Sequence, residues 1–339
     1  MPPRPHRPSA LAWQVFRGSD VIRQGLVTRH QLRGSSWIRL RHDVYADARL
    51  DRDHALACRA AALRLPPEAV IAGPSSAYLH GIEHAAGFDD DVHVLVPRAC
   101  RVDSQRRLRV HLLGAADPPP TGASPAATPA LPGASPATTP ALPGASPAAA
   151  PPLLPPMADV GGAIAPRRTD PTSAAWETAV WLDPLRAVPI IDSLLACGLT
   201  TQAALTTVGT ANADRPGGRR ATWVFGLADP GAQSPPESQL RVRLVLGGLP
   251  RPVTQHPIRV AGGLVLHPDL AWPEFRVAVE YDGRWHADPE QLHRDRRRLN
   301  LLVGAGWLIL HVTGRRLYND FPAVLGEVRS ALLSRGWRR

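Results

Sequence analysis

The chain of 339 residues is long enough for two or three domains, and its 44% hydrophobic content, sufficient for a core in each, excludes a wholly disordered protein. All 39 basic residues are arginine, which excludes any catalytic role that needs a lysine ammonium group. The net charge of +10 comes from both ends, since residues 1–60 and 233–339 each carry six more Arg than acidic residues, and this favours a polyanionic partner, nucleic acid before membrane.

Residues 1–8 lack the apolar stretch of a secretory signal, and no proline-free run of about 18 apolar residues occurs in the chain. We therefore expect a cytoplasmic protein without a membrane partner. The three cysteines, Cys58, Cys100 and Cys197, have no ligand-like spacing, and we interpret them as buried structural thiols.

Residues 10–47 predict two short helices followed by a hairpin. Ser19 is expected to cap a turn over 20–24 that ends at Gly25, and Thr28 to cap a second helix over 29–33. Strands are predicted over 37–41 and 44–46, which together with the helices predicts a winged helix. Six of its polar residues would contact DNA, the first four in the groove and the last two at phosphates: Arg29, His30, Gln31, Arg33, Arg39 and Arg41. An ordinary polar surface is the alternative for these six.

The middle of the chain alternates helical and strand patterns on both sides of a proline-rich stretch. Before that stretch we predict helices over 53–64 and 75–81 and strands over 70–73, 92–97 and 108–113; after it we predict helices over 172–182, 184–198 and 200–207. Residues 118–156 hold fourteen prolines and no charged or aromatic residue, with an eleven-residue repeat that begins at Gly122 and again at Gly133. This composition predicts an extended, disordered linker.

The last third has the pattern of an α/β domain. A helix is predicted from Ser234 to Leu246, followed by three strands over 252–260, 264–272 and 275–282, a charged helix over 288–303, a strand over 307–313 and a helix over 320–335.

Acidic residues of the predicted hairpin could form a catalytic site. A tight turn at Pro273-Glu274 would make Asp269 and Glu280 diagonal neighbours on one face of the sheet, and the period of two places Asp282 on that face as well. Three carboxylates repel one another unless a divalent cation neutralises them. The pattern is typical of a nuclease site in which Mg²⁺ or Mn²⁺, held by Asp269 and Glu280, activates a water. His286 would serve as general base or contact the scissile phosphate.

Each of these residues also has an ordinary interpretation. The hairpin carboxylates could be solvated ion pairs with Arg276 and Arg284. Glu237 could complete a capping box that begins at Ser234. Asp295 and Arg298, three residues apart on the charged helix, could be a solvated face or could support the site from one side.

Five separated motifs occur in order in the last third: Ser234-Pro-Pro-Glu237, Pro268-Asp269, Val279-Glu280-Tyr-Asp-Gly283 with His286, Asp295-x-x-Arg298, and Gly306-Trp307. Together they resemble the Vsr-like, restriction-endonuclease-type domain of the PD-(D/E)XK fold, found in many proteins of unknown function. The resemblance implies that Glu237, Asp269 and Glu280 are the acidic metal- and phosphate-site residues, with His286 nearby. Asp282 stands where restriction enzymes commonly have lysine, which bears on activity more than on fold.

The segment Gly18-Ser-Asp-Val-Ile-Arg-Gln-Gly-Leu-Val-Thr28-Arg-His-Gln-Leu32, followed by residues 37–45, resembles the winged helix of AbiEi-type antitoxins of type IV toxin–antitoxin systems. The resemblance implies binding of promoter DNA through the second helix, and it admits a cognate toxin as a second partner.

The predicted protein is therefore a multidomain α+β or α/β chain. Its parts are a winged-helix domain over 1–54, a mixed α/β middle region over 55–114 and 157–232, a disordered linker over 115–156 and an endonuclease-type domain over 233–339. Two functions remain open. One is a DNA-binding protein with a Mg²⁺- or Mn²⁺-dependent endonuclease or nickase domain and no small-molecule cofactor; the other is a non-catalytic DNA-binding regulator of antitoxin type. Double-stranded DNA is the expected partner in both.

Overall fold

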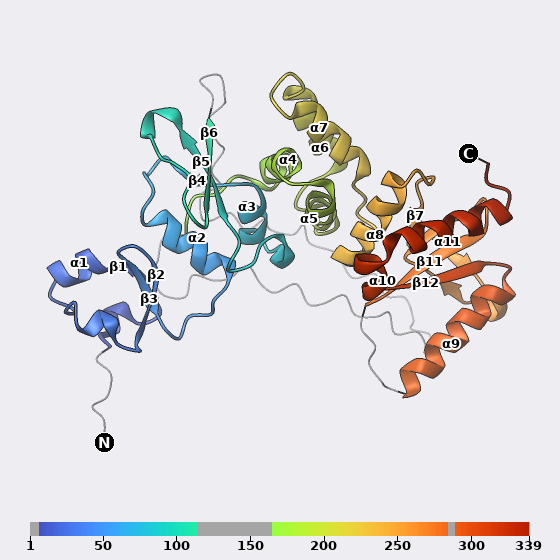
Figure 1. Ribbon diagram of the computed structural model, residues 1–339, viewed down its shortest axis with the longest axis horizontal. Helices are drawn as coiled ribbons and strands as arrows, with labels where there is room; N and C mark the ends of the chain where they lie inside the picture. Colours follow the sequence, from blue (N-terminus) through green and yellow to red (C-terminus); the bar gives the residue numbers. More distant parts are fainter. Residues whose placement is uncertain (1–6, 114–164, 284–288, 339) are drawn as a thin grey trace, which may run out of the picture. The chain divides into compact units, whose positions relative to one another are not determined.

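The computed structural model describes residues 7–113, 165–283 and 289–338, without the side chains of 289–295. These residues form two compact units that divide between Asp170 and Pro171. The architecture is mixed α and β, with small sheets and α-helices in both units (Figure 1). The linker predicted over 115–156 lies outside the described residues, and the predicted boundary at 232/233 falls inside the second unit.

None of the described helices is long and apolar enough to cross a membrane.

The first unit begins with a three-stranded antiparallel sheet in the order β1 (Val15–Arg17), β3 (Val44–Asp47), β2 (Trp37–Arg41). It confirms the two predicted strands, but the helices differ from the prediction. Helix α1 spans Gly18–Arg23, so Ser19 lies inside it rather than capping it, and its hydroxyl donates to Asp43 at 2.6 Å.

The helix predicted over 29–33 is wrong in length, because only a 3-10 turn at Gln31–Arg33 forms. The Thr28 hydroxyl accepts from the Gln31 amide (3.2 Å), and the Gln31 side-chain oxygen accepts from the Thr28 amide (2.7 Å). This reciprocal cap closes a single turn, and the chain becomes extended at Gly34.

The second sheet of the first unit has the order β4 (Val70–Ile71), β5 (Val92–Pro97), β6 (Leu108–Leu113), with α2 (His54–Ala62) and α3 (Gly73–Leu79). The structure confirms the strands predicted over 92–97 and 108–113, which pair in parallel. Val92, Val94 and Val96, alternate residues of β5, are fully buried and form one core cluster with Cys58 of α2. Cys58 is the one cysteine that fits the prediction of buried thiols, since Cys100 is half-buried and Cys197 is exposed.

The second unit begins with four helices, α4 (Pro171–Trp181), α5 (Pro184–Ala196), α6 (Gln202–Ala211) and α7 (Gly218–Leu227). The first three confirm the predicted helices, and Asp183 caps α5 through the amides of Leu185 and Arg186. Helix α7 was not predicted, because Gly217-Gly218 reads as a break. Gly217 instead begins the helix at φ 86°, where a Cβ atom would lie 2.6 Å from Val180.

Helix α8 (Pro235–Leu246) leads into a four-stranded sheet in the order β12 (Leu308–Thr313), β11 (Val277–Asp282), β10 (Leu270–Trp272), β7 (Val253–Thr254). Strands β8 (Ile258–Arg259) and β9 (Val265–Leu266) form a separate hairpin, so the strands predicted over 252–260 and 264–272 are each broken in two. Gln255, at φ 48°, turns the chain out of the first strand. The remaining helices are α9 (Pro289–Gly304), α10 (Gly314–Asn319) and α11 (Phe321–Ser334).

The two faces of this sheet contact different elements. Val277 and Val279 of β11 pack with Leu240 and Leu244 of α8 and with buried residues of α11. On the opposite face, Ile309 of β12 packs with Leu302 of α9 and with the β8–β9 hairpin. Because β11 and β12 are parallel and Ala278 pairs with Ile309, the face toward α9 also carries the next alternate residues of β11, Glu280 and Asp282.

Candidate active site of the C-terminal sheet

The strand register brings two of the predicted acidic residues together. Leu270 pairs with Val279 and Trp272 with Val277, and one further step along this register sets Asp269 opposite Glu280. The prediction that they are diagonal neighbours is wrong by two residues, because the connection is a four-residue loop over 273–276 rather than a two-residue turn. In this loop Arg276 adopts φ 50°, and its amide donates to the Pro273 carbonyl.

Asp269 lies at the centre of the group. One carboxylate oxygen accepts from the Tyr281 amide at 2.7 Å, and the other from the Gln255 side-chain amide at 3.3 Å. Burial, together with the negative charges of Glu237 and Glu280, outweighs these hydrogen bonds and raises the pKa of Asp269 from 3.8 to about 7. Three acidic residues from separate parts of the sequence therefore share one electrostatic environment.

Glu280 is held by a cation from α9. Its Oε1 lies 3.1 Å from Nε and 3.0 Å from Nη2 of Arg298, and Nη2 also donates to the His267 carbonyl at 2.6 Å. The structure thus brings Arg298 against the site. Among the described residues, Glu280 therefore forms its ion pair with Arg298 and not with Arg276, the partner that the alternative interpretation gave it. His286 and Arg284 lie outside the described residues, and the Asp295 side chain is not described either.

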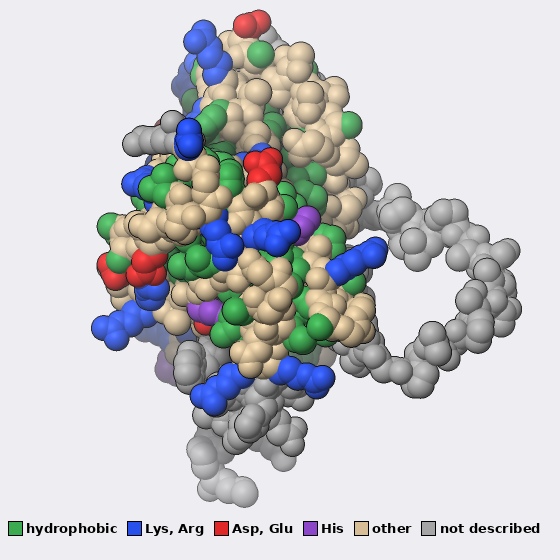
Figure 2. Space-filling view, turned by 90° about the vertical axis from the view of Figure 1, so that its right-hand side faces the viewer, with side chains coloured by type: hydrophobic (Ala, Val, Ile, Leu, Met, Phe, Trp, Pro, Cys, Tyr) green, Lys and Arg blue, Asp and Glu red, His purple; other side chains and the backbone are tan. Residues whose placement is uncertain are grey.

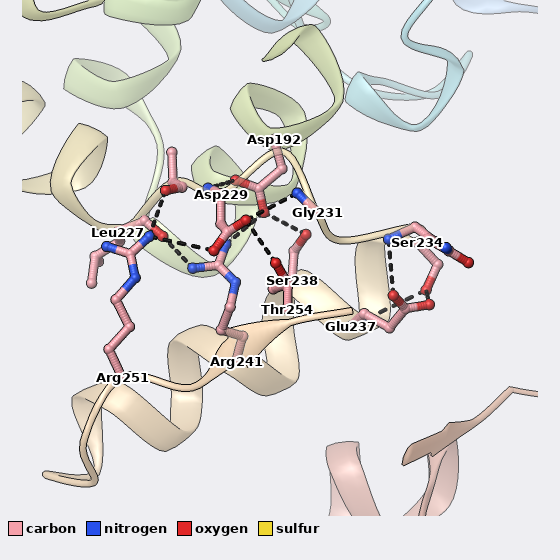
Figure 3. A network of polar contacts seen from close by, with 12 residues as sticks. Asp192, Leu227, Asp229, Gly231, Ser234, Glu237, Ser238, Arg241, Arg251 and Thr254 are labelled. Carbon is pink, nitrogen blue, oxygen red and sulfur yellow. Dashed lines mark hydrogen bonds and ion pairs between the residues drawn. The ribbon is translucent and has the colours of Figure 1, made fainter. Parts of the chain in front are cut away.

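Glu237 has the capping role and also contributes charge to the site. Its Oε1 accepts from the Ser234 hydroxyl at 2.7 Å and its Oε2 from the Gln233 amide at 2.9 Å, while Ser234 Oγ accepts from the Glu237 amide (Figure 3). Ser234 thus makes its half of the predicted capping box, whereas Glu237 reaches the amide of Gln233, one residue before the N-cap, instead of the amide of Ser234. Both carboxylate oxygens therefore have donors, and the charge of Glu237 still raises the pKa of Asp269.

Asp282 pairs with a histidine that sequence reasoning missed. Its Oδ2 lies 3.2 Å from Nδ1 of His311, on β12. His311 is the register partner of Glu280 and therefore lies on the same sheet face. The sequence carries one sign of it: His311 and Thr313 interrupt a strand that is otherwise apolar, and both fall on the α9 face by the period of two.

A buried ion pair fixes helix α8, on which Glu237 lies. Asp192 of α5 accepts from Arg241 Nη2 and from the Ser238 hydroxyl, both at 2.6 Å, and from the Asp229 amide at 2.7 Å (Figure 3). Arg241 also donates to the Leu227 carbonyl. Asp192 and Arg241 are each 1% exposed. Burying such a pair is costly unless further hydrogen bonds satisfy its atoms. Here both Asp192 oxygens and both terminal nitrogens of Arg241 have partners, whereas Arg241 Nε has none among the described residues.

The donor chemistry at Asp269 and Glu280 suits a hard divalent cation. Among the described residues, no group of three or more His, Cys, Asp or Glu side chains is arranged to hold a metal ion. Mg²⁺ is usually held by only one or two carboxylates, with waters and substrate phosphates completing its octahedron. Asp269 and Glu280 supply two carboxylates on one sheet face, and the charge of Glu237 raises the pKa of Asp269. This arrangement fits that mode of binding.

The six predicted DNA-contacting residues differ in their surroundings. Four are exposed: Arg29, His30, Arg33 and Arg39. Gln31 is bonded within its own turn, and the half-buried Arg41 donates to the Arg107 carbonyl at 2.5 Å. Figure 2 faces the second unit and so does not display these six residues; the face that it shows carries several separate arginine side chains, with acidic side chains in a few places.

The chain is similar to two proteins of Mycobacterium tuberculosis. They are named Uncharacterized protein Rv2248 (strain ATCC 25618 / H37Rv) and Uncharacterized protein MT2308 (strain CDC 1551 / Oshkosh), and each is 34% identical over 157 residues, which cover 45% of this chain. The matched part spans 56% of each relative. No family model matches the chain, and no solved structure matches it.

Proposed function

We propose that the second unit hydrolyses a DNA phosphodiester bond in a metal-dependent manner at the pair Asp269 and Glu280. The observation that carries the proposal is the β10–β11 register, which sets these carboxylates opposite each other on the face toward α9. The nearby charge of Glu237 and the contact of Arg298 with Glu280 support it. All these groups come from the motifs that resemble a restriction-endonuclease-type domain.

Protein groups would hold the catalytic carboxylates in place. The Tyr281 amide and the Gln255 side chain orient Asp269, and Arg298 orients Glu280 while keeping a guanidinium beside the site, where it can bind a phosphate oxygen. Asp282 orients the ring of His311. His311 lies on the same sheet face as Glu280 and would act as the general base. Mg²⁺ or Mn²⁺ held by Asp269 and Glu280 would supply positive charge for the phosphate and a more acidic water.

A second candidate is a DNA-binding regulator without catalysis. It is favoured by the ion pair of Glu280 with Arg298, which neutralises one expected ligand, and by the absence of lysine from the chain. Such a protein would bind duplex DNA through exposed arginines such as Arg29, Arg33 and Arg39 and would leave it intact.

Cleavage assays with matched variants test the proposal. Supercoiled plasmid and an end-labelled duplex would be incubated with the full chain and Mg²⁺, Mn²⁺ or EDTA. We expect metal-dependent cleavage that falls by about a hundredfold or more in Asp269→Asn and Glu280→Gln. Glu274→Gln, an equal charge change at an exposed residue of the same hairpin, should cleave like the wild type.

Binding without cleavage by the wild type in either metal would favour the regulator. Cleavage that survives unchanged in Asp269→Asn would remove the proposed site while leaving a nuclease elsewhere in the chain.

A further inference from the structure

A pocket of about 420 Å³ opens in the first unit between the tip of the β2–β3 hairpin, helix α2 and the segment that leads into β6. Its volume is within the range of small-molecule sites, roughly 300–1,000 Å³. None of the residues that form it belongs to the site on the C-terminal sheet. It includes Arg41, which the sequence had assigned to phosphate contact on an exposed wing.

The lining separates into an apolar wall and a cationic rim. Ala57 and Ala61 of α2 form part of the wall, together with Leu65 and the ring of Phe88. The rim carries four arginines and one histidine: Arg41, His42, Arg64, Arg106 and Arg107. The residues that line the pocket include no carboxylate, and such a concentration of one charge sign selects an anionic ligand.

The arginines are held in place mainly by neutral groups. Arg41 donates to the Arg107 carbonyl at 2.5 Å, and Arg64 donates to the His42 carbonyl at 3.4 Å. Arg107 pairs with Asp89, which lies outside the lining, and its guanidinium carbon lies 5.5 Å from the centre of the Phe88 ring. Carbonyl partners fix Arg41 and Arg64 in position without cancelling their charge, whereas the charge of Arg107 is paired with that of Asp89. Burial and the proximity of Arg107 accordingly lower the pKa of Arg41.

We propose that this pocket binds one nucleotide, with the phosphate among the arginines and the base against the apolar wall. A planar ring can stack on an aromatic face such as that of Phe88, and guanidiniums bind phosphate oxygens in bidentate fashion. The choice of a nucleotide among anionic ligands rests on the proposed nucleic-acid function. The same chemistry is offered by a free nucleotide and by an unpaired nucleotide of a DNA strand that lies along the β2–β3 hairpin.

Calorimetric titration of the full chain tests the assignment. The probes are deoxyadenosine 5′-monophosphate, deoxyadenosine and inorganic phosphate. We expect the monophosphate to bind at least about tenfold more tightly than either part alone. Its affinity should fall about tenfold or more in Arg64→Ala and in Arg106→Ala, since a charge-assisted hydrogen bond is worth roughly 1.5–3 kcal/mol. Ala57→Leu should weaken it by filling the wall without changing the charge.

The matched control is Arg52→Ala, which removes the same charge from an exposed residue that does not line the pocket. Arg106 is itself exposed, so its replacement tests the pocket without threatening the fold. Equal loss of affinity in Arg52→Ala, or equal affinity for phosphate and for the monophosphate, would overturn the assignment. So would failure of the monophosphate to bind.

A second titration distinguishes the source of the nucleotide. An unpaired dA twelve-mer that binds more tightly than the monophosphate and is weakened by Arg64→Ala supports a DNA strand, whereas equal affinities support a free nucleotide. All titrations are run in EDTA, so they do not depend on cleavage. An inactive wild type that still binds the monophosphate in the pocket refutes the nuclease and leaves this site standing.

Discussion

Replacing Asp269 by asparagine should stabilise the protein at neutral and alkaline pH. A group whose pKa is raised in the folded state binds more protons there than in the unfolded chain. The wild type therefore loses stability as the pH rises from about 4 to about 7, between the two pKa values. Asparagine has no charge to lose, so the advantage of the variant should grow across this window and remain constant at higher pH.

The size of the effect follows from the pKa of Asp269. One pKa unit corresponds to about 1.4 kcal/mol, so the rise from 3.8 to about 7 corresponds to about 4 kcal/mol. Screening of a carboxylate that is partly open to solvent reduces this to roughly 2 kcal/mol. The variant keeps the hydrogen bond from the Tyr281 amide, and the side-chain amide of Gln255 can turn over to face the new NH₂ group.

The assay is urea unfolding of both proteins in EDTA at several pH values from 4.5 to 8.5, repeated with Mg²⁺ or Mn²⁺. At 100 times its Kd, the metal should add about 2.7 kcal/mol to the wild type and nothing to Asp269→Asn. Glu274→Gln is the control for removal of a carboxylate. A variant that is less stable than the wild type at pH 8, or a difference that does not change with pH, would refute the reasoning.

Three further perturbations have defined outcomes. Glu237→Gln should move the pKa of Asp269 back toward its usual range, which would appear as a smaller pH dependence of the free energy of unfolding. Glu237→Ala should have the same effect and should also lose the contact with Ser234, at a cost of about 1 kcal/mol. Equal pH dependence in the wild type and both variants would contradict this reasoning. Asp192→Ala should cost about 3–5 kcal/mol in urea unfolding, because it leaves Arg241 buried without its carboxylate, and a cost under about 1 kcal/mol would count against that account. Deleting residues 1–50 should lower the magnitude of the salt slope of duplex binding by about 0.9 for each lost phosphate contact, and an unchanged slope would remove the N-terminal sheet from DNA binding.

Sequence reasoning placed Asp269 and Glu280 on one sheet face in spite of a wrong register. The shift introduced by the loop over 273–276 is two residues, and side chains alternate with a period of two, so the faces are conserved. A shift of one residue would have sent one of the carboxylates into the core. The loop itself was unpredictable, because its geometry depends on Arg276 adopting a positive φ that its residue type does not favour.

The features that sequence reasoning did not predict depend on contacts between segments that are distant in the sequence. The pairing of Asp282 with His311 depends on the parallel alignment of β11 with β12, and the alignment is fixed by packing against α9 and α11 rather than by a local turn. The second helix of the predicted winged helix is reduced to a single turn because the chain becomes extended at Gly34 and pairs with β3 from Trp37 onward. The contact of Gln31 with Thr28 favours the start of a helix, and local propensity does not show where strand pairing ends it.

The salt bridge between Asp192 and Arg241 limits how this protein can be divided. The carboxylate belongs to the helical stretch before residue 233 and the guanidinium to the stretch after it. A fragment of residues 233–339, transplanted by recombination or fused to another protein, would carry a buried cation without its counterion. The smallest fragment that keeps this ion pair intact within one unit therefore begins near Pro171. It includes the four helices that precede the C-terminal sheet, so a transfer of the sheet to another protein must transfer these helices as well.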